Sequence, residues 1–240
     1  MSGISLTSDH ETIQEWARIR RGKPSRVADE QQGTETLSIQ FPDSTNGNHE
    51  RIQWRSFFAK FDKQHLCMAY DNKTEDNRLS QYYQFMPAPR GILLTLHTEH
   101  EAVMRLFDEL ANTTTRATKA RTQGALQLEK LLKPHMKGEE KVFYPRLVHE
   151  CDEEDAIIEI LEGYEEHKAA KRVLKDLQKT KPDSLEWAAR LSVLQELIVH
   201  HIGEEVSEIF PTAWEKLDND TFEKLDTAYK ARERKRIANM

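Results

Sequence analysis

Cysteine is almost absent from this sequence. The 240 residues include two cysteines, Cys67 and Cys151, which lie far apart and form no Cys-x-x-Cys pair. A disulfide scaffold, a thiolate zinc site and an iron–sulfur ligand set all need more cysteines than this. Any bound metal must therefore be held by histidine and carboxylate side chains.

Long apolar runs and a targeting signal are also missing. The longest near-continuous apolar stretch, residues 91–96, is far shorter than the ~18–20 residues that a membrane helix needs. The first ten residues have neither the basic region nor the apolar region of a secretory signal. We therefore expect a cytoplasmic protein with no membrane-spanning segment.

An excess of basic charge is the third absence. The chain has 41 acidic and 35 basic residues, which give a formal net charge of -6. This balance provides no electrostatic footprint for wrapping nucleic acid. The basic run at residues 230–236 includes a glutamate and is expected to be a solvated helix end. We expect no nucleic-acid partner.

The length and the distribution of apolar residues predict two folded domains. Hydrophobic residues make up 38% of the chain and occur throughout it, which excludes wholesale disorder. The chain is longer than the commonest single domain of ~100–150 residues. Residues 87–91, Pro-Ala-Pro-Arg-Gly, suit neither a helix nor a strand. We expect a small α+β domain at residues 1–88 and a second domain at residues 91–240.

The first domain is predicted to combine short helices and strands. Amphipathic spacing predicts helices at residues 7–22 and 54–62, and alternation predicts strands at residues 37–41, 66–70 and 79–86, with a loop at residues 42–48. An aromatic stripe at helical spacing is expected to be core: Trp54, Phe57, Phe58 and Phe61. Through DHETIQEW (9–16), GKP (22–24) and WRSFFAKFD (54–62), this stretch resembles a small bacterial domain that also occurs as a stand-alone protein.

From residue 92 onward the apolar periodicity is helical. Long helices are predicted at residues 92–110, 118–149, 153–178 and 184–217, and a shorter fifth helix is predicted to start at Asp220. Four long antiparallel helices with short connections predict a four-helix bundle, here with an extra C-terminal helix. Pro134 is expected to kink the second helix.

Two of these helices each direct a histidine and a glutamate into the apolar face. His135 and Glu139 lie four residues apart between leucines and a phenylalanine, and His201 and Glu205 repeat this arrangement between aliphatic residues. Each histidine is followed by a proline ten residues later. The pair one residue earlier on the fourth helix lacks both features, so we identify His201 and Glu205 as the inward pair.

The first and third helices each add one inward histidine, His100 and His167. Burying charged side chains without a partner costs several kcal/mol each, and a whole domain is stable by only ~5–15 kcal/mol. A cation must therefore compensate. Four imidazoles and two carboxylates without sulfur suit iron, manganese or zinc, and they exceed one tetrahedral site. They suit two metal ions bridged by glutamate.

This pattern resembles the hemerythrin-like (HHE) domain family over nearly all of residues 92–217. The resemblance rests on TEH (98–100), PHMKGEEKVFYP (134–145), EEH (165–167) and HIGEEVSEIFP (201–211). It implies a non-haem di-iron centre with an oxo or hydroxo bridge, in which Glu139 and Glu205 bridge two iron ions. The ligands that it implies are His100, His135, Glu139, His167, His201 and Glu205.

One departure from the family pattern affects the expected function. Oxygen-carrying members place a second histidine one turn away on the third helix, where this chain has Gly163 and Lys171. One coordination position is thereby left to water, to Tyr164 or to His97, which argues against simple reversible oxygen carriage. His97 is more simply a neighbour of the site than a ligand. Glu140 and Glu204 are expected to be solvated acids or neighbours of the ligands.

The resemblance implies a protein that binds or senses dioxygen, nitric oxide or redox state. A di-iron redox enzyme is one alternative, acting in peroxide breakdown or in iron donation for iron–sulfur cluster repair. An iron-responsive interaction protein is another, with a protein partner acting through the N-terminal domain. Zinc stays a further option, because histidine and glutamate do not by themselves select the metal.

Overall fold

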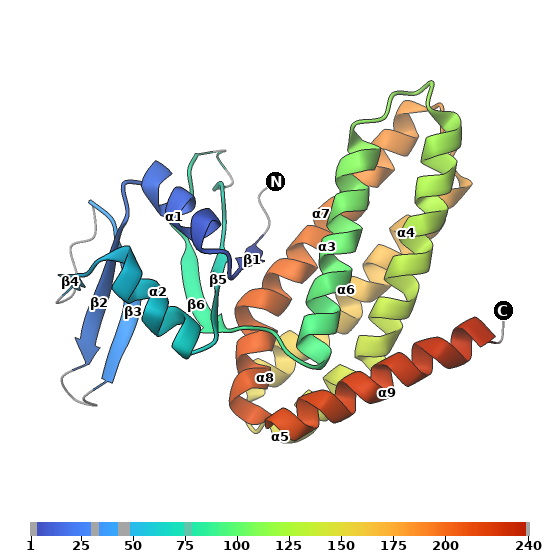
Figure 1. Cartoon of the computed structure of the whole chain (residues 1–240). Helices are drawn as coiled ribbons and strands as arrows, with labels where there is room; N and C mark the ends of the chain where they lie inside the picture. Colours follow the sequence, from blue (N-terminus) through green and yellow to red (C-terminus); the bar gives the residue numbers. More distant parts are fainter. Residues whose placement is uncertain (1–3, 30–33, 43–48, 75, 77, 239–240) are drawn as a thin grey trace. The chain divides into compact units, whose positions relative to one another are not determined.

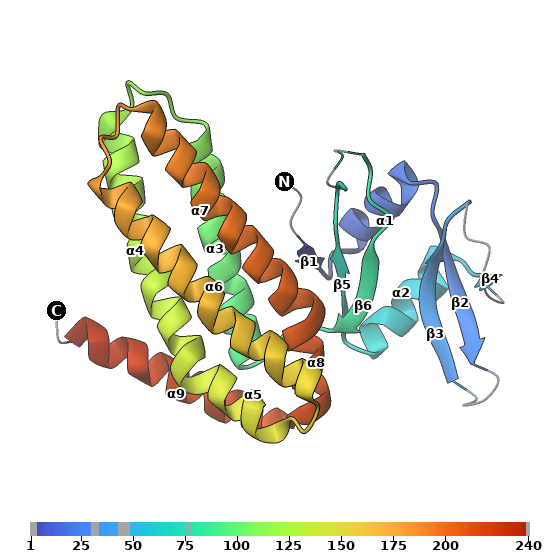
Figure 2. The same cartoon turned by 180° about the vertical axis from the view of Figure 1, so that it is seen from behind.

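The chain consists of two compact units, Met1–Ala88 and Pro89–Met240. The computed structural model describes residues 4–29, 34–42, 49–74, 76 and 78–238. The first unit combines strands with two short helices, and the second is helical (Figures 1 and 2). The expected fold class, a small α+β unit followed by a helical bundle, is confirmed.

Two three-stranded antiparallel sheets form the first unit together with two helices. The strand orders are β1-β5-β6 and β3-β2-β4. The strands are β1 (Ser5–Thr7), β2 (Lys23–Asp29), β3 (Thr34–Gln40), β4 (His49–Arg51), β5 (Leu66–Tyr70) and β6 (Tyr83–Pro87), and the helices are α1 (His10–Ile19) and α2 (Trp54–Lys63).

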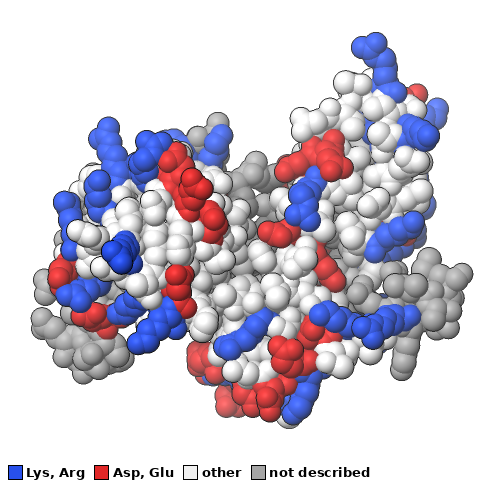
Figure 3. Space-filling model, in the orientation of Figure 1, with Lys and Arg blue, Asp and Glu red and all other residues white. Residues whose placement is uncertain are grey.

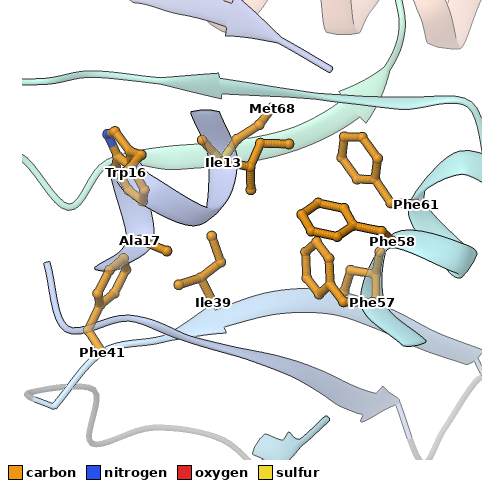
Figure 4. Packing of buried hydrophobic residues seen from close by; sticks show 10 residues of the cluster. Ile13, Trp16, Ala17, Ile39, Phe41, Phe57, Phe58, Phe61 and Met68 are labelled. Carbon is orange, nitrogen blue, oxygen red and sulfur yellow. The ribbon is translucent and has the colours of Figure 1, made fainter. Parts of the chain in front are cut away.

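The core of this unit lies between its helices and sheets. Asp9 starts α1, because its carboxylate accepts the backbone N–H of Thr12 at 2.7 Å. The aromatic stripe of α2 is buried as expected, apart from the half-buried Trp54, and it packs against Ile13 and Met68 (Figure 4). The prediction that this stripe is core, rather than a binding face, is confirmed.

The strands of the first unit were only partly predictable. β3 and β5 lie where alternation predicts strands, whereas β1, β2 and β4 have no such pattern. β2 contains Pro24 and polar residues, and it is a strand because all seven of its residues pair with β3. The strand predicted at residues 79–86 begins only at Tyr83, and Leu79 forms an isolated bridge with Lys73. The loop predicted at 42–48 lies, apart from Pro42, outside the described residues.

Four long helices form the second unit. Figures 1 and 2 show α3, α4, α6 and α7 packed side by side, with α9 against α3 and α4. The elements are α3 (Ile92–Ala111), α4 (Thr118–Gly138), η1 (Glu139–Phe143), α5 (Tyr144–Glu150), α6 (Glu154–Lys179), α7 (Leu185–Glu204), η2 (Glu205–Ile209), α8 (Phe210–Lys216) and α9 (Asn219–Ala238). Over the described part of the chain, no helix is long and apolar enough to span a membrane.

The second and fourth predicted helices are each interrupted by one π-helical segment. In η1 the backbone N–H of Tyr144 donates to the backbone carbonyl of Glu139. In η2 the backbone N–H of Phe210 donates to the backbone carbonyl of Glu205. The next residue in both cases is a proline, which lacks an N–H and would clash with the carbonyl four residues back. The proline that follows each histidine by ten residues thus marks the end of a π segment. A continuous helix was the wrong expectation at these two places.

The kink expected at Pro134 stays a prediction, and the helical hydrogen bonding of this segment changes at Glu139. α4 runs through the buried Pro134 to Gly138, and its hydrogen-bonding pattern changes at Glu139. Single π turns inside α-helices occur frequently at functional sites. Both π segments of this chain begin at a predicted ligand, Glu139 or Glu205.

Candidate metal centre

The structure brings all six predicted ligand side chains together in the core of the helical unit. Each is at most 3% exposed. They form two groups that share Glu139, and in each group the possible ligand atoms lie within 4.8 Å of one another. The first group is His100, His135, Glu139 and Glu205, and the second is Glu139, His167 and His201.

The four imidazoles are arranged as two facing pairs. The Nε2 atoms of His100 and His135 are 3.0 Å apart, and those of His167 and His201 are 3.1 Å apart. The ring planes are inclined by 73° and 64°. In each pair two nitrogen lone pairs can therefore converge on one position, which is the arrangement that a shared cation needs.

The two glutamates contact these pairs differently. Glu139 directs Oε1 to Nε2 of His135 at 3.0 Å and Oε2 to Nε2 of His167 at 3.3 Å. Its two oxygens thus face different imidazole pairs. Glu205 uses one oxygen, Oε2, which lies 3.1 Å from Nε2 of His100 and 3.8 Å from that of His201.

Several buried polar atoms at this point make no hydrogen bond of good geometry among the described residues, although the carboxylate oxygens lie close to imidazole nitrogens. They are both carboxylate oxygens of Glu139, Oε2 of Glu205 and Nδ1 of His100. A buried carboxylate oxygen without a donor is costly unless a cation compensates it. Imidazole nitrogen and carboxylate oxygen together suit iron, manganese or zinc. The residues present therefore fit a metal cation.

Comparison with known proteins agrees with this geometry. Residues 92–213, about half of the chain, match the family model described as the Hemerythrin HHE cation binding domain. The chain belongs to the hemerythrin HHE cation-binding family. The histidines and glutamates that converge in this structure all lie within the HHE domain, and the family is described as cation-binding.

One solved structure and one curated relative are also similar to the chain. The crystal structure of a hemerythrin HHE cation-binding domain-containing protein from Mycobacterium kansasii has a TM-score of 0.52 at 18% identity, over 61% of this chain and 87% of that one. This likeness shows the fold. A protein named DNA nickase from Nostoc sp. (strain PCC 7120) is 28% identical over 136 residues. The match covers 57% of this chain and 37% of the Nostoc protein.

Three of the four imidazoles in the HHE domain are also held at Nδ1 by a carboxylate. These contacts join His135 to Glu99 at 2.8 Å, His201 to Glu166 at 2.8 Å and His167 to Glu140 at 3.1 Å. An imidazole that donates its Nδ1 proton in this way presents Nε2 as a lone pair. The outer carboxylates therefore orient the rings for metal binding.

Glu99 and Glu166 were not identified from the sequence as part of the site. Each directly precedes a predicted ligand, His100 or His167, so the signal lay in the TEH and EEH motifs. Their side chains reach the histidine of the following helix in the chain, which only the packed bundle reveals. Glu140, expected to be a solvated or neighbouring acid, is a neighbour that contacts His167.

The buried acids and imidazoles of the site shift one another's pKa values. Burial by itself would lower the pKa of His135, but the carboxylates of Glu139 and Glu99 outweigh this effect and raise that pKa well above its usual value. Burial would raise the pKa of Glu139, and the imidazole of His135 outweighs it and lowers that pKa well below its usual range. A proton on His135 thus partly replaces the cation.

Gly163 and Lys171, which lie one turn before and one turn after His167, have other roles in this structure. A Cβ atom on Gly163 would lie 3.0 Å from the hydroxyl oxygen of Tyr144, so the Tyr144 side chain fills the space beside this glycine. The Tyr144 hydroxyl donates to Oε1 of Glu205 at 2.7 Å. Lys171 contacts Oε1 of Glu140 at 2.5 Å. Tyr144 is a residue of the site that the sequence did not identify.

His97, one of the two residues considered for the remaining coordination position, lies outside both ligand groups. Tyr164 is the other residue considered. Nε2 of His97 is 3.8 Å from a carboxylate oxygen of Glu101. The Tyr164 hydroxyl donates to the backbone carbonyl of Glu140 at 3.3 Å. The printed contacts of these two residues are thus with groups other than the six predicted ligands.

Proposed function

We propose that the HHE domain holds two iron ions bridged by Glu139 and Glu205, and that it binds or senses dioxygen, nitric oxide or redox state. The observation that carries this proposal is the position of Glu139, whose two oxygens face two different imidazole pairs. Iron bound there would supply one-electron redox chemistry and a position for a small ligand.

The residues around the site favour a small ligand over a larger substrate. Phe143, Tyr144 and Phe210 are fully buried beside the histidines, and Phe210 stacks on His100 with ring centroids 6.3 Å apart. Apolar rings packed beside the histidines favour a small ligand over a bulky one. Selectivity by size in an apolar enclosure supports a diatomic ligand.

Iron content and the optical spectrum test this proposal. Protein produced with iron and purified without oxygen is expected to hold two iron ions per chain and to change its spectrum when oxygen or nitric oxide is added. Spectral bands that reverse on removing the gas indicate binding, and irreversible oxidation indicates sensing or catalysis. Retention of less than one metal ion per chain would contradict the proposal.

A matched pair of double variants shows whether the predicted histidines hold the metal. His135→Ala with His201→Ala is expected to abolish iron retention, because each imidazole pair loses one member. His65→Ala with His149→Ala removes two exposed histidines and is expected to retain the iron of the original chain. Equal iron in the two double variants would exclude the site.

Redox catalysis such as peroxide breakdown is the second candidate function, and Tyr144 favours it. Cleavage of the O–O bond of peroxide needs a proton at the oxygen that leaves as water, and the second peroxide returns protons when it is oxidised to dioxygen. The Tyr144 hydroxyl holds a proton at 2.7 Å from Glu205. Burial and the nearby carboxylates raise the pKa of Tyr144 well above its usual value, so the hydroxyl stays protonated and remains a hydrogen-bond donor beside the site. Tyr144→Phe is expected to slow peroxide disproportionation at unchanged iron content. An unchanged rate would remove the support that Tyr144 gives this candidate.

We also propose that the chain has no nucleic-acid partner. Its formal net charge is -6, and basic and acidic side chains are interspersed over the face of the helical unit seen in Figure 3. The name of the Nostoc relative describes a protein of which this chain matches 37%. Salt-dependent binding of duplex DNA by the purified chain would contradict this proposal.

A further inference from the structure

A hollow of about 620 Å³ on the helical unit is lined by lysines. It lies along α4, η1 and α6, the helices that run side by side in Figure 2. Its lining residues are Lys133, Lys137, Glu140, Lys141, Lys171 and Lys175. Five cationic groups and one anionic group thus meet in one place on a chain whose net charge is -6.

The lysines form two rows with helical spacing. Lys133, Lys137 and Lys141 follow one another at four-residue steps along α4 and η1, and Lys171 and Lys175 do the same on α6. Like charges four residues apart on a helix repel one another. The two rows therefore carry an unfavourable charge density that a bound anion would relieve.

Three of the five ammonium groups are free. Lys133 pairs with Glu129, and Lys171 pairs with Glu140. Among the residues that the structure describes, no hydrogen bond or ion pair is made by Lys137, Lys141 or Lys175. All three side chains are exposed and border the same hollow. They are available to a ligand.

We propose that this hollow binds a small anion through a phosphoryl group, either inorganic phosphate or the phosphates of a single nucleotide. A phosphoryl group offers several charged oxygens and can accept from several ammonium groups at once. From Lys133 to Lys141 the row spans eight residues, about 12 Å of helix. This length fits one small molecule better than the extended backbone of a nucleic acid.

The hollow is connected to the candidate metal centre through two contacts. Lys171 contacts Oε1 of Glu140 at 2.5 Å, and the same oxygen lies 3.1 Å from Nδ1 of His167. An anion that draws Lys171 away leaves Glu140 to interact with His167 alone. His167 then becomes a stronger electron donor at Nε2. This coupling rests on the proposed metal function, whereas the anion site itself does not.

Calorimetric titration of the 240-residue chain as purified tests the anion site. Inorganic phosphate and adenosine triphosphate are titrated at low salt into the original chain and into a Lys137→Gln, Lys141→Gln, Lys175→Gln variant. The control is Lys119→Gln, Lys130→Gln, Lys179→Gln, which removes the same charge from exposed positions on α4 and α6 outside the hollow. At least a tenfold loss of affinity is expected in the first variant only.

Two results would overturn the anion site. One is that neither phosphate nor the nucleotide binds, or that the two triple variants lose affinity equally. The other is that duplex DNA binds more tightly than both small anions, because the hollow would then be part of a nucleic-acid surface. Tighter binding of inorganic phosphate or of the nucleotide identifies which source of the phosphoryl group is used.

The coupling is tested by the reduction potential of the iron-loaded protein with and without saturating phosphate. The potential is expected to fall in the original chain, because a stronger imidazole donor stabilises the oxidised metal. In Lys171→Gln the anion still meets the other lysines, but the shift is expected to be lost. An equal shift in both proteins would overturn the coupling. Failure to load iron would instead contradict the proposed metal function. The anion site would still be tested by calorimetry, which does not need iron.

Discussion

Glu139 determines much of the geometry of the candidate metal centre. It is fully buried, and its oxygens face His135 on one side and His167 on the other. Glu205 differs, because one of its oxygens accepts the Tyr144 hydroxyl. The two expected bridges are therefore inequivalent, and we expect them to differ in how strongly they hold the metal ions.

The outer carboxylates provide the first prediction at the scale of the residue. Glu99→Gln and Glu166→Gln leave every predicted ligand in place. The first weakens the hydrogen bond to Nδ1 of His135, and the second weakens the hydrogen bond to Nδ1 of His201. Each substitution is expected to lower metal affinity by about 10- to 100-fold. Competition titration with a chelator measures the loss. The exposed Glu165→Gln is the control, and an equal loss in that variant would contradict the assignment.

The second prediction concerns the pH dependence of metal binding. The pKa of His135 is raised in the metal-free site, so a metal ion must displace a proton from its imidazole. An imidazole with a raised pKa stays protonated to a higher pH, and metal affinity should therefore increase as the pH rises above the usual histidine pKa of about 6.5. Calorimetry in buffers of different ionisation enthalpy counts the protons released. Metal uptake without proton release would contradict this assignment.

At the scale of the element, the two π segments set the register of the ligands. Each begins at a glutamate of the site and ends two residues before a proline that cannot continue the ordinary hydrogen-bond ladder. Because of these prolines, the same π-helical interruption follows both α4 and α7. The bundle thus has two similar halves, one containing α3 and α4 and the other containing α6 and α7. The last helix, α9, then makes the halves different, because the Tyr229 hydroxyl donates to Glu99 in one half at 2.6 Å.

Packing of α9 gives the third prediction. A Cβ atom on Gly138 would lie 2.1 Å from the Tyr229 ring, whereas a Cβ atom on Gly203 would meet nothing within 4 Å. Gly138→Ala is expected to lower the free energy of unfolding by about 1–3 kcal/mol through overpacking. Gly203→Ala, the matched control on α7, is expected to raise it by up to ~1 kcal/mol, because alanine favours a helix. Urea unfolding measures both changes, and equal effects would contradict the packing of α9.

At the scale of the whole molecule, each unit contains one buried cysteine. Cys67 lies in the first unit and Cys151 in the second, with exposed fractions of 3% and 6%. Burial raises the pKa of Cys67 to about 12, and it also raises the pKa of Cys151. Both thiols should therefore react slowly with alkylating reagents until the unit that contains them opens.

These two cysteines give the fourth prediction, which concerns metal removal. All six predicted ligands lie in the second unit, so loss of the cation leaves uncompensated charge there and not in the first. Chelation is expected to accelerate alkylation of Cys151 by iodoacetamide at pH 8, with little change at Cys67. Mass spectrometry of the two cysteine peptides follows each rate. Equal acceleration at both sites would show that the metal stabilises the two units together.

Much of the helical unit could be predicted because its signals are local. Apolar periodicity placed α3 and α6 to within one residue at each end, and the repeated His-x-x-x-Glu spacing drew attention to the side chains that the structure brings together. The strands of the first unit were harder. β2 has little apolar alternation, and its conformation depends on pairing with a strand that follows it in the chain.

The sequence by itself determined the ligand types, their spacing along each helix and the exclusion of a sulfur-bound metal, because these depend on composition and helical periodicity. Only the tertiary structure decided which carboxylate holds which imidazole, because Glu99 and Glu166 act on histidines about 35 residues away along the chain. It also decided that Tyr144 occupies the space beside Gly163 and that Lys171 pairs with Glu140. Contacts between helices depend on how the helices pack, and helical periodicity alone does not specify that packing.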